Sequence, residues 1–409
     1  MIPFGDGGKL SLDEAVPRLL DRPQPTREIQ EWLAKVDKIA PVIEQYRNDN
    51  EDRRVTSAET LDAVREAGLH RMWVSREFGG GQVGIATGSA VIQALARLDA
   101  SVAWQVGVQG AIGRLSDYLP EETSRKLFAE SDKLVVGGVN PSGTAEAVEG
   151  GFRLNGKWSF ASGSAHADWL VCAARVTDDG KPRLGEAGPV LRMLFLPRSS
   201  VTFVDDWHTL GLRGTGSVSY LVDDVFVSED HTVDVATMHA APLPRDSRAY
   251  GISYYDFGPF TSSSTALGIA QDALRTFKDL ALHKTPAGGS STLAGSHVVQ
   301  DKLARMEMAV HSSRLVLAHA AQQATEHGAD GGDELTSLIR LTVATVAENA
   351  CQVVDTAHQY AGTSSLYTAS RLERNLRDVR SAVKHVTLSH SHFEMVGQYL
   401  LTGKLLMRR

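Results

Sequence analysis

Fourteen histidines and two cysteines are the side chains best suited to bind a metal or act as a base or nucleophile in this chain of 409 residues. Cys172 and Cys351 are far apart and form no CxxC pair, so neither a zinc site nor a disulfide framework is expected. No GxGxxG follows an expected strand, and GxxxxGKS/T, HExxH and GxSxG are absent. A nicotinamide Rossmann site, an ATPase, a zinc protease and an α/β hydrolase are therefore disfavoured. The chemistry must come from a bound cofactor or from residues dispersed along the chain.

Four short segments carry the most distinctive combinations of glycine, hydroxyl, aromatic and charged residues. In chain order they are Asn155–Gly163, Trp207–Ser217, Val222–Val227 and Arg377–Arg380. The first reads Asn-Gly-Lys-Trp-Ser-Phe-Ala-Ser-Gly, and the second ends in Arg-Gly-Thr-Gly-Ser. Each segment is a weak signal by itself, so the order in which they occur carries the information.

The N-terminal part of the chain is expected to be helical. A chain of 409 residues exceeds the roughly 250 residues at which one core stops growing, so two or three units are expected. Apolar residues at three- and four-residue steps predict helices over Arg27–Arg53 and Ser57–Ala67. A longer apolar helix is expected over Ala86–Tyr118, with a bend near Asp99. These elements form an N-terminal α-helical domain over residues 1–132.

Short β-like runs separated by turns follow over residues 133–230. Asn155-Gly156 lies between two such runs, and this pair predicts the turn of a β-hairpin. The block is therefore expected to form a small antiparallel β-barrel or sandwich.

Helical periodicity returns over residues 231–409. Four helices are expected, over Thr261–His283, Val298–Glu326, Asp333–Tyr360 and Asp378–Leu401. Four long helices joined by short loops predict an up-down bundle. The fold class is therefore α+β and mostly α, with a helical domain, a central β-barrel domain and a C-terminal four-helix bundle.

This order of domains, with the four segments in place, resembles the acyl-CoA dehydrogenases over about Arg27 to Leu401. Asn155–Gly163 is similar to the family strand that passes the flavin ring. Trp207–Ser217 is similar to the family loop that follows it, and Val222–Val227 to the strand that closes the β domain. Arg377–Arg380 matches the start of the family's final helix. The resemblance implies a flavoprotein.

The branch of the family depends on the residues around position 385. Acyl-CoA dehydrogenases carry a glutamate base there, whereas this chain has His385 and Val386. Asp256 occupies the other position that the family uses for its base, which keeps a flavin dehydrogenase open as the alternative. Ala161–Trp169 and His385 resemble the two-component flavin monooxygenases that share this fold. A non-catalytic scaffold that has lost its flavin is the third possibility.

The resemblance implies an oxygenase component that hydroxylates an organic substrate, aromatic or polycyclic. Reduced flavin, FADH2 or FMNH2, would come from a separate NAD(P)H-dependent flavin reductase and react with O2 to a C4a-hydroperoxyflavin. The resemblance also implies a homotetramer. The formal charge of −7 argues against nucleic-acid binding. The sequence shows neither a signal peptide nor a membrane span, so a cytoplasmic enzyme is expected.

The resemblance also nominates site residues. Ser162 is expected to donate a hydrogen bond to flavin N5 or to the peroxide, and His385 to hold the peroxide proton or act as a base. A turn serine and a structural histidine are the plain alternatives. The expected flavin-binding residues are Asn140, Ser142, Phe160, Ser162, Thr215, Ser217, Gly362 and Thr363, the last two from a neighbouring subunit. The expected substrate-binding residues are Trp104, Ile112 and His392.

Two of these nominations depend on position. Ile112 stands where related phenol hydroxylases carry histidine, which points to a larger and more apolar substrate than a simple phenol. His390 and His392 follow His385 on the expected last helix, where His392 lies nearer the face of His385 and is the backup candidate. A helix C-cap explains Gly362 as well as a flavin contact does.

Overall fold

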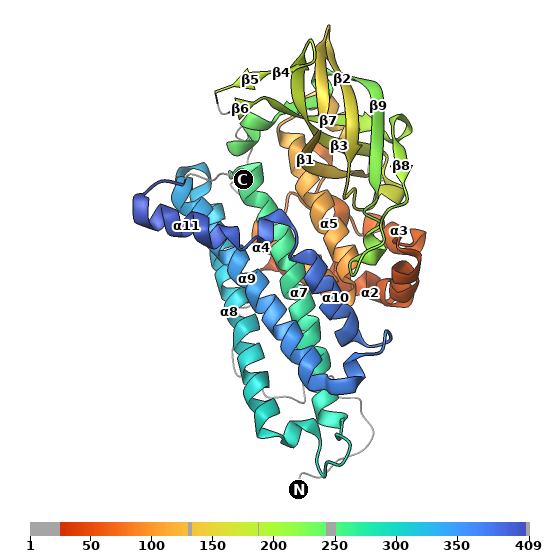
Figure 1. Ribbon diagram of the computed structural model, residues 1–409, viewed down its shortest axis with the longest axis vertical. Coiled ribbons are helices and arrows are strands. Elements are labelled where there is room, and N and C mark those ends of the chain that lie inside the picture. The colour runs from red at the N-terminus through yellow and green to blue at the C-terminus, as the bar shows by residue number, and fades with distance from the viewer. Residues whose placement is uncertain (1–24, 130–132, 187, 243–250, 406–409) are drawn as a thin grey trace.

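The N-terminal helices lie against one end of the sheet. The computed structural model describes residues 25–129, 133–186, 188–242 and 251–405. Figure 1 shows the sheet at one end of the molecule, the long helices at the other, and α5 between them. The N-terminal helices are α2 (Arg27–Arg53), α3 (Ala58–Glu66), α4 (Ile85–Leu98), α5 (Ala100–Gly113) and α6 (Glu121–Phe128).

Side-chain caps set the bounds of these helices. Thr26 accepts from the Ile29 N–H at the start of α2, and Ser57 accepts from the Thr60 N–H at the start of α3. Asp99 is extended, at φ −151°, and accepts from the Ser101 and Val102 N–H groups. The predicted long helix is therefore two helices joined at Asp99, as the expected bend there indicated.

The central domain is one eight-stranded sheet. Its strand order is β10–β7–β3–β1–β2–β9–β8, with β4 paired to β3. The strands are β1 (Val135–Val148), β2 (Gly151–Trp158), β3 (Trp169–Asp178), β4 (Lys181–Pro182), β7 (Leu191–Pro197), β8 (Thr202–Val204), β9 (Ser219–Ser228) and β10 (Thr232–Asp234). A separate pair consists of β5 (Leu184–Gly185) and β6 (Gly188–Pro189).

The expectation of a purely antiparallel domain was wrong at the centre of the sheet. β1 pairs antiparallel with β2 but parallel with β3. The segment after β2 carries the chain across, so that β3 starts opposite the start of β1, with Trp169 beside Val135. A parallel pair needs such a crossover, and this one holds Ser162. The crossover thus places a candidate site residue near the starts of β1 and β3, two central strands of the sheet.

The predicted hairpin at Asn155-Gly156 was also wrong. Both residues lie inside β2, and the turn between β1 and β2 lies between Val148 and Gly151, which pair with each other. Gly156 has φ +154° and lies at a register shift between β2 and β9. A Cβ there would lie 2.7 Å from the Gly143 Cα and 2.9 Å from the Trp158 ring. Close approach of two strands, rather than a turn, therefore requires this glycine.

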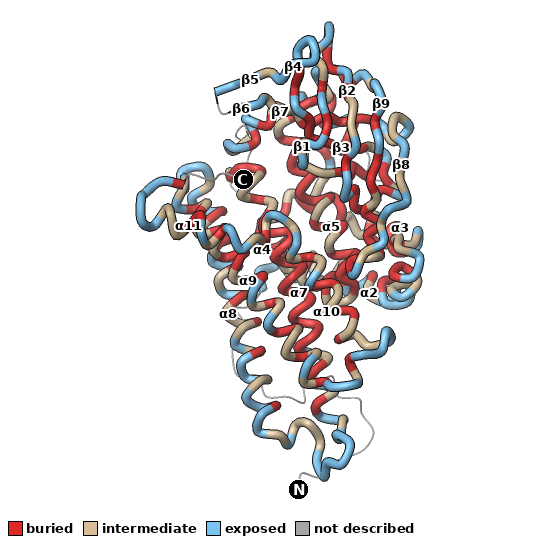
Figure 2. The backbone as a smooth tube through the Cα atoms, in the orientation of Figure 1, coloured by how far each residue is buried: buried red, intermediate tan, exposed pale blue. Residues whose placement is uncertain are grey.

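The C-terminal bundle packs around one buried helix, α7 (Tyr254–His283). It contacts α4, α5, α8 (His297–His327), α9 (Gly332–Ala361) and α10 (Arg371–Ala382). Figure 2 shows α7 buried along much of its length, whereas α8 is largely exposed toward its N-terminal end. None of the described helices is long and apolar enough to cross a membrane.

α7 starts seven residues before the predicted Thr261, even though Pro259 lies in its first turns. Ser253 caps it by accepting from the Asp256 N–H. Proline cannot donate to the Tyr255 carbonyl, and Arg340 of α9 donates to that oxygen instead at 2.9 Å. A contact from another helix therefore compensates for the proline, which local sequence could not indicate.

The predicted last helix, Asp378–Leu401, is two helices. α10 starts at Arg371 and ends at Ala382, and α11 covers Ser391–Thr402. Between them His385 is extended, and its ring accepts from the Thr387 N–H. Side chains that bond to their own backbone compete with a helix, which explains the break. Arg377 and Asp378 thus lie in the middle of α10, and the comparison of His390 and His392 on one helix with His385 was wrong.

Buried ion pairs join α10 to the N-terminal helices. Arg374 lies 3.3 Å from Asp99 and 3.6 Å from Glu51 of α2, and Arg377 lies 2.5 Å from Glu51. Asp378 accepts from the Leu212 N–H at 2.7 Å. α10 therefore holds the loop Trp207–Ser217 against the rest of the molecule.

Gly211 provides a test of this packing. A Cβ at Gly211 would lie 2.2 Å from the Arg377 carbonyl oxygen of α10. We expect Gly211→Ala to lower the free energy of unfolding by about 1–3 kcal/mol, as overpacking does, in urea denaturation. Gly397→Ala in α11 is the matched control, because nothing lies within 4 Å of its Cβ position; it should be neutral or stabilising. Equal stability of Gly211→Ala and the wild type would contradict the close contact.

Candidate flavin and substrate site

Ser162 lies at one end of a line of buried hydroxyl groups. Its Oγ lies 2.7 Å from the Ser217 Oγ, and the Ser217 Oγ lies 2.6 Å from the Thr215 Oγ1. The Thr215 Oγ1 donates to the Leu212 carbonyl at 2.7 Å. The three hydroxyl residues are each at most 3% exposed. We call Leu212, Thr215, Ser217 and Ser162 the hydroxyl chain.

Phe160, two residues before Ser162, is unusual in two respects. It has φ +68°, a left-handed conformation that a bulky residue rarely adopts, and its side chain is 65% exposed. Its ring contacts that of Trp207 edge to face at 6.1 Å. A strained, exposed aromatic residue beside buried hydroxyls is what a site for a planar aromatic ligand requires.

The nearby part of β1 pairs irregularly with the neighbouring strands. Its register with β3 passes from Gly138 to Pro141 and from Pro141 to Gly143, and its pairing with β2 starts only at Thr144. The Cβ position of Gly138 lies 3.5 Å from the Ser159 carbonyl oxygen, so this segment runs beside the crossover that holds Ser162. Asn140 and Ser142 are exposed and bonded to each other at 3.1 Å. These groups fit the polar edge of a flavin ring, whose donors and acceptors alternate.

His385 belongs to a second cluster, on the bundle side. Its Nδ1 lies 2.7 Å from the Thr387 Oγ1, which lies 2.6 Å from the Ser262 Oγ of α7. Trp104 of α5 meets the imidazole ring edge to face, with centroids 5.4 Å apart. Burial lowers the pKa of His385 to about 4. The imidazole is therefore neutral at pH 7.

The tautomer of His385 follows from its backbone contact. The Thr387 N–H points at Nδ1 from 3.4 Å, which favours the neutral tautomer that carries its proton on Nε2. No hydrogen-bond partner of Nε2 is found among the residues that the structure describes. His385 therefore presents an Nε2–H donor.

α5 connects the two clusters. Trp104 contacts His385, and the next residue, Gln105, donates to the Thr56 hydroxyl at 2.5 Å and to the Gly214 carbonyl at 3.4 Å. Gly214 immediately precedes Thr215 of the hydroxyl chain. One turn of α5 thus contacts the Ser162 side and the His385 side, which brings the two predicted catalytic residues to one region.

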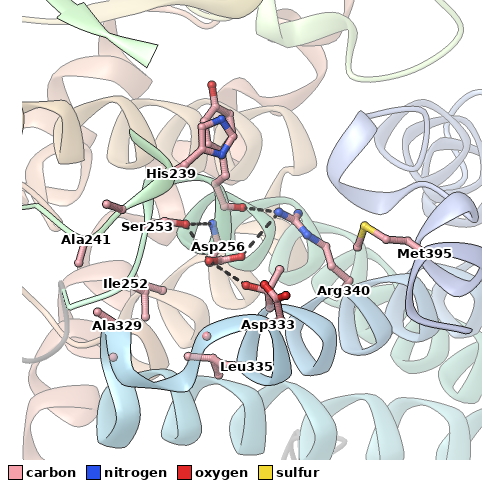
Figure 3. Close-up of a pocket in the computed structure, with 15 residues that line it drawn as sticks. His239, Ala241, Ile252, Ser253, Asp256, Ala329, Asp333, Leu335, Arg340 and Met395 are labelled. Atoms are coloured by element: carbon pink, nitrogen blue, oxygen red, sulfur yellow. Dashed lines mark hydrogen bonds and ion pairs between the residues drawn. The ribbon is translucent and has the colours of Figure 1, made fainter. Parts of the chain in front are cut away.

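Asp256, the alternative base, is engaged elsewhere. Its Oδ2 accepts from the Ser253 and Thr336 hydroxyls at 2.7 and 3.2 Å, and Oδ1 lies 3.7 Å from Arg340. Figure 3 shows Asp256 between Ser253 and Arg340 in the wall of a cavity of about 260 Å³. Its two oxygens thus serve the junction of α7 and α9, and no contact joins Asp256 to His385 or Trp104 among the described residues.

Other predicted site residues lie away from these clusters within one chain. Gly362 and Thr363 follow α9 and are exposed, at the end of the bundle farther from the sheet in Figure 1. Ile112 is 3% exposed and packs in the core between the N-terminal helices and the sheet. His392 is buried, and its Nε2 lies 3.1 Å from the Thr387 carbonyl, behind the residue that orients His385. Their predicted roles in binding stay predictions.

Sequence reasoning missed the polar partners of the predicted residues. Thr387, Ser262 and Gln105 carry the contacts that orient His385 and hold the loop before Thr215. Thr387 lay inside the segment compared with the family, but hydroxyl and amide residues are common and gave no signal of their own. Ser262 stands in a run of five hydroxyl residues, Thr261 to Thr265, and the sequence does not distinguish it from its neighbours.

The low pKa of His385 predicts a pH effect. Between about pH 6.5 and 4 the unfolded chain binds a proton that His385 in the folded protein does not. The stability that His385 contributes is therefore complete above pH 6.5 and is lost as the pH falls toward 4. Histidine NMR, with the signal assigned through His385→Asn, should show no titration of His385 above pH 5. Titration near pH 6.5 would contradict the burial of the neutral ring.

Comparison with known proteins identifies the family of the chain. The sequence models named "Acyl-CoA dehydrogenase, N-terminal domain" and "Acyl-CoA dehydrogenase, C-terminal domain" match residues 26–129 and 260–390. The chain is 29% identical to an indole-3-acetate monooxygenase of Pseudomonas putida, with 84% of this chain and 87% of that protein covered. It is 28% identical to the FADH(2)-dependent resorcinol hydroxylase, oxygenase component, of Rhizobium sp., with 93% and 96% covered.

Solved structures show the same fold. XiaF from Streptomyces sp., solved in complex with FADH2 and glycerol, superposes with a TM-score of 0.87 at 23% identity, covering 93% of this chain and 97% of that one. The HsaA monooxygenase from M. tuberculosis superposes with a TM-score of 0.82 at 22% identity, covering 92% and 99%. The two domain models together match more than half of the chain, and the relatives are flavin-dependent monooxygenases. The chain therefore belongs to the acyl-CoA dehydrogenase family, in its branch of flavin-dependent monooxygenases.

Proposed function

We propose that this protein is the oxygenase component of a two-component flavin monooxygenase that hydroxylates an aromatic substrate with reduced flavin and O2. The observation that carries the proposal is the composition of the His385 cluster. Among the described residues its hydrogen-bond and ring contacts are Trp104, Thr387 and, through Thr387, Ser262, and none of them is a carboxylate. A dehydrogenase needs a carboxylate base at this place, whereas an oxygenase needs a hydrogen-bond donor in an apolar setting.

Flavin fits the Ser162 side of the site. Phe160 would pack on the ring, while Asn140, Ser142 and the β1 backbone between them would bind its polar edge. Ser162 would meet the ring at the end of the hydroxyl chain. Reduced flavin and O2 together supply the activated oxygen atom. FADH2 and FMNH2 both remain candidates, because the solved relatives hold either FADH2 or FMN.

His385 acts as a hydrogen-bond donor in this proposal. Its Nε2–H points away from the bond that Nδ1 makes to Thr387, and its lowered pKa makes the ring a weak base at neutral pH. It therefore holds a proton at the place where oxygen is transferred, and the base role expected beside it loses support. Trp104 shields the ring edge from water.

The substrate is proposed to be aromatic. The relatives are named for indole-3-acetate, resorcinol and p-hydroxyphenylacetate, all of which carry an aromatic ring. Trp104 and, one turn later, Val108 are the partly exposed residues of α5, and buried Ile112 continues their stripe. An apolar stripe without a histidine at position 112 supports a substrate larger and less polar than a simple phenol.

Partners of the protein form part of the proposal. A separate NAD(P)H-dependent flavin reductase delivers reduced flavin, as the name "oxygenase component" of the relatives implies for them. A homotetramer would cover large apolar side chains that are exposed on the bundle and bring Gly362 and Thr363 to the flavin of a second copy. The exposed large apolar residues of the described part of the bundle are Leu282, Val298, Met308, Leu315, Leu366, Tyr367, Val386, Leu400 and Leu401. Free Cys172 and Cys351 suit the reducing cytoplasm.

Rapid mixing tests the proposal. The protein is loaded anaerobically with reduced flavin and then mixed with oxygenated buffer. We expect a transient absorbance that differs from both reduced and oxidised flavin and that depends on the protein. Reoxidation of the flavin at the rate of free reduced flavin, with no transient species, would contradict the proposal.

Replacement of His385 tests the donor role. His385→Asn retains a side-chain N–H donor, whereas His385→Ala removes it, so the alanine variant should release at least about tenfold more hydrogen peroxide per flavin oxidised. Peroxide and hydroxylated product are measured with a panel of indole and phenol substrates. His390→Ala, at an exposed position on the far side of the turn, is the control. Equal coupling in all three variants would remove His385 from the reaction.

A further inference from the structure

The hydroxyl chain has a fixed direction. The Leu212 carbonyl can only accept, so the Thr215 hydroxyl, at 2.7 Å, donates its one hydrogen to that carbonyl. Thr215 can then only accept from Ser217, so the Ser217 hydroxyl donates its hydrogen to the Thr215 Oγ1 at 2.6 Å. Ser217 in turn can only accept from Ser162, at 2.7 Å. The hydrogen of Ser162 therefore points into the protein.

The reverse direction is physically unfavourable. It would place two oxygen atoms 2.7 Å apart at Leu212 and Thr215 with no hydrogen between them. The Trp207 Nε1–H and the Thr215 N–H donate to the same carbonyl, at 3.3 and 3.1 Å, so all of its contacts here are with donors.

Ser162, which is 3% exposed, is consequently an acceptor toward any ligand that reaches its Oγ. This reverses the expectation that Ser162 donates to flavin N5 or to a peroxide. Reduced flavin carries hydrogen on N5 and donates there, whereas oxidised flavin has a bare N5 that can only accept. An oriented acceptor therefore distinguishes the two redox states of one ligand by a single hydrogen atom.

We propose that the hydroxyl chain selects reduced over oxidised flavin, with Thr215 and Ser217 as positioning residues that keep the lone pairs of Ser162 directed at the flavin. The inference rests on the proposed function, because it assumes a flavin beside Ser162. Such selection suits an enzyme that takes up reduced flavin by diffusion and must release the oxidised product. It requires no residue of the His385 cluster.

The test compares the affinities for the two redox states. Dissociation constants for oxidised and for reduced flavin are measured anaerobically in the full-length wild type, Thr215→Val and Ser217→Ala. Each substitution frees the Ser162 hydrogen to turn toward N5. We expect the ratio of the two constants, oxidised over reduced, to fall about tenfold in both variants, the worth of one hydrogen bond. The midpoint potential of bound flavin should fall correspondingly by about 30 mV.

The control is Thr209→Val. Thr209 lies in the same loop, and its hydroxyl also donates to a carbonyl, that of Gly211 at 3.0 Å, but it is outside the hydroxyl chain. Its ratio should equal that of the wild type. A purely structural role of Thr215 would weaken both redox states equally and leave the ratio and the potential unchanged.

Three outcomes separate the claims. A lowered ratio in Thr215→Val and Ser217→Ala, with Thr209→Val unchanged, supports the selection. A wild-type ratio in both chain variants overturns it and leaves the proposed function intact. Absence of binding of either flavin to the wild-type protein overturns both. If Thr215→Val fails to fold, Ser217→Ala decides alone, since it removes only one oxygen atom.

Discussion

The hydrogen bond from the Leu212 N–H to the Asp378 carboxylate is the contact on which the site depends. It is 2.7 Å long and joins the bundle to the loop that begins the hydroxyl chain. Burial raises the pKa of Asp378 to about 6, against the opposing charge of Arg374. Because Arg374 also pairs with Asp99 at the start of α5, one buried cluster fixes α10, α5 and the loop together. Buried ion pairs add little net stability, so position is their contribution here.

The sequence predicted well those parts of the fold that local signals decide. The N-terminal helices and three bundle helices follow from local periodicity and from caps such as Ser57 and Asp99. The errors fall where distant contacts decide. Gly156 serves a close approach to Gly143 instead of a turn, and Pro259 stays inside α7 because Arg340 satisfies the carbonyl it leaves.

The site divides in the same way. Short motifs were enough to nominate Ser162 and His385, and both lie in clusters that α5 connects. Motifs did not reveal what orients them. The proton on Nε2 of His385 depends on the Thr387 N–H, and the hydrogen of Ser162 depends on a carbonyl 50 residues away. Donor and acceptor roles are properties of such bonds, so the residue type alone could not assign the role of Ser162.

The central claim is that one flavin ring lies beside Ser162 and faces a substrate region bounded by Trp104 and His385. The most direct measurement is a crystal structure of the protein grown anaerobically with reduced flavin. The account predicts a ring packed on Phe160, with N5 at hydrogen-bond distance from the Ser162 Oγ and no other flavin in the chain. A ring bound instead in the cavity beside Asp256 and Arg340, or with N5 turned away from Ser162, would contradict it.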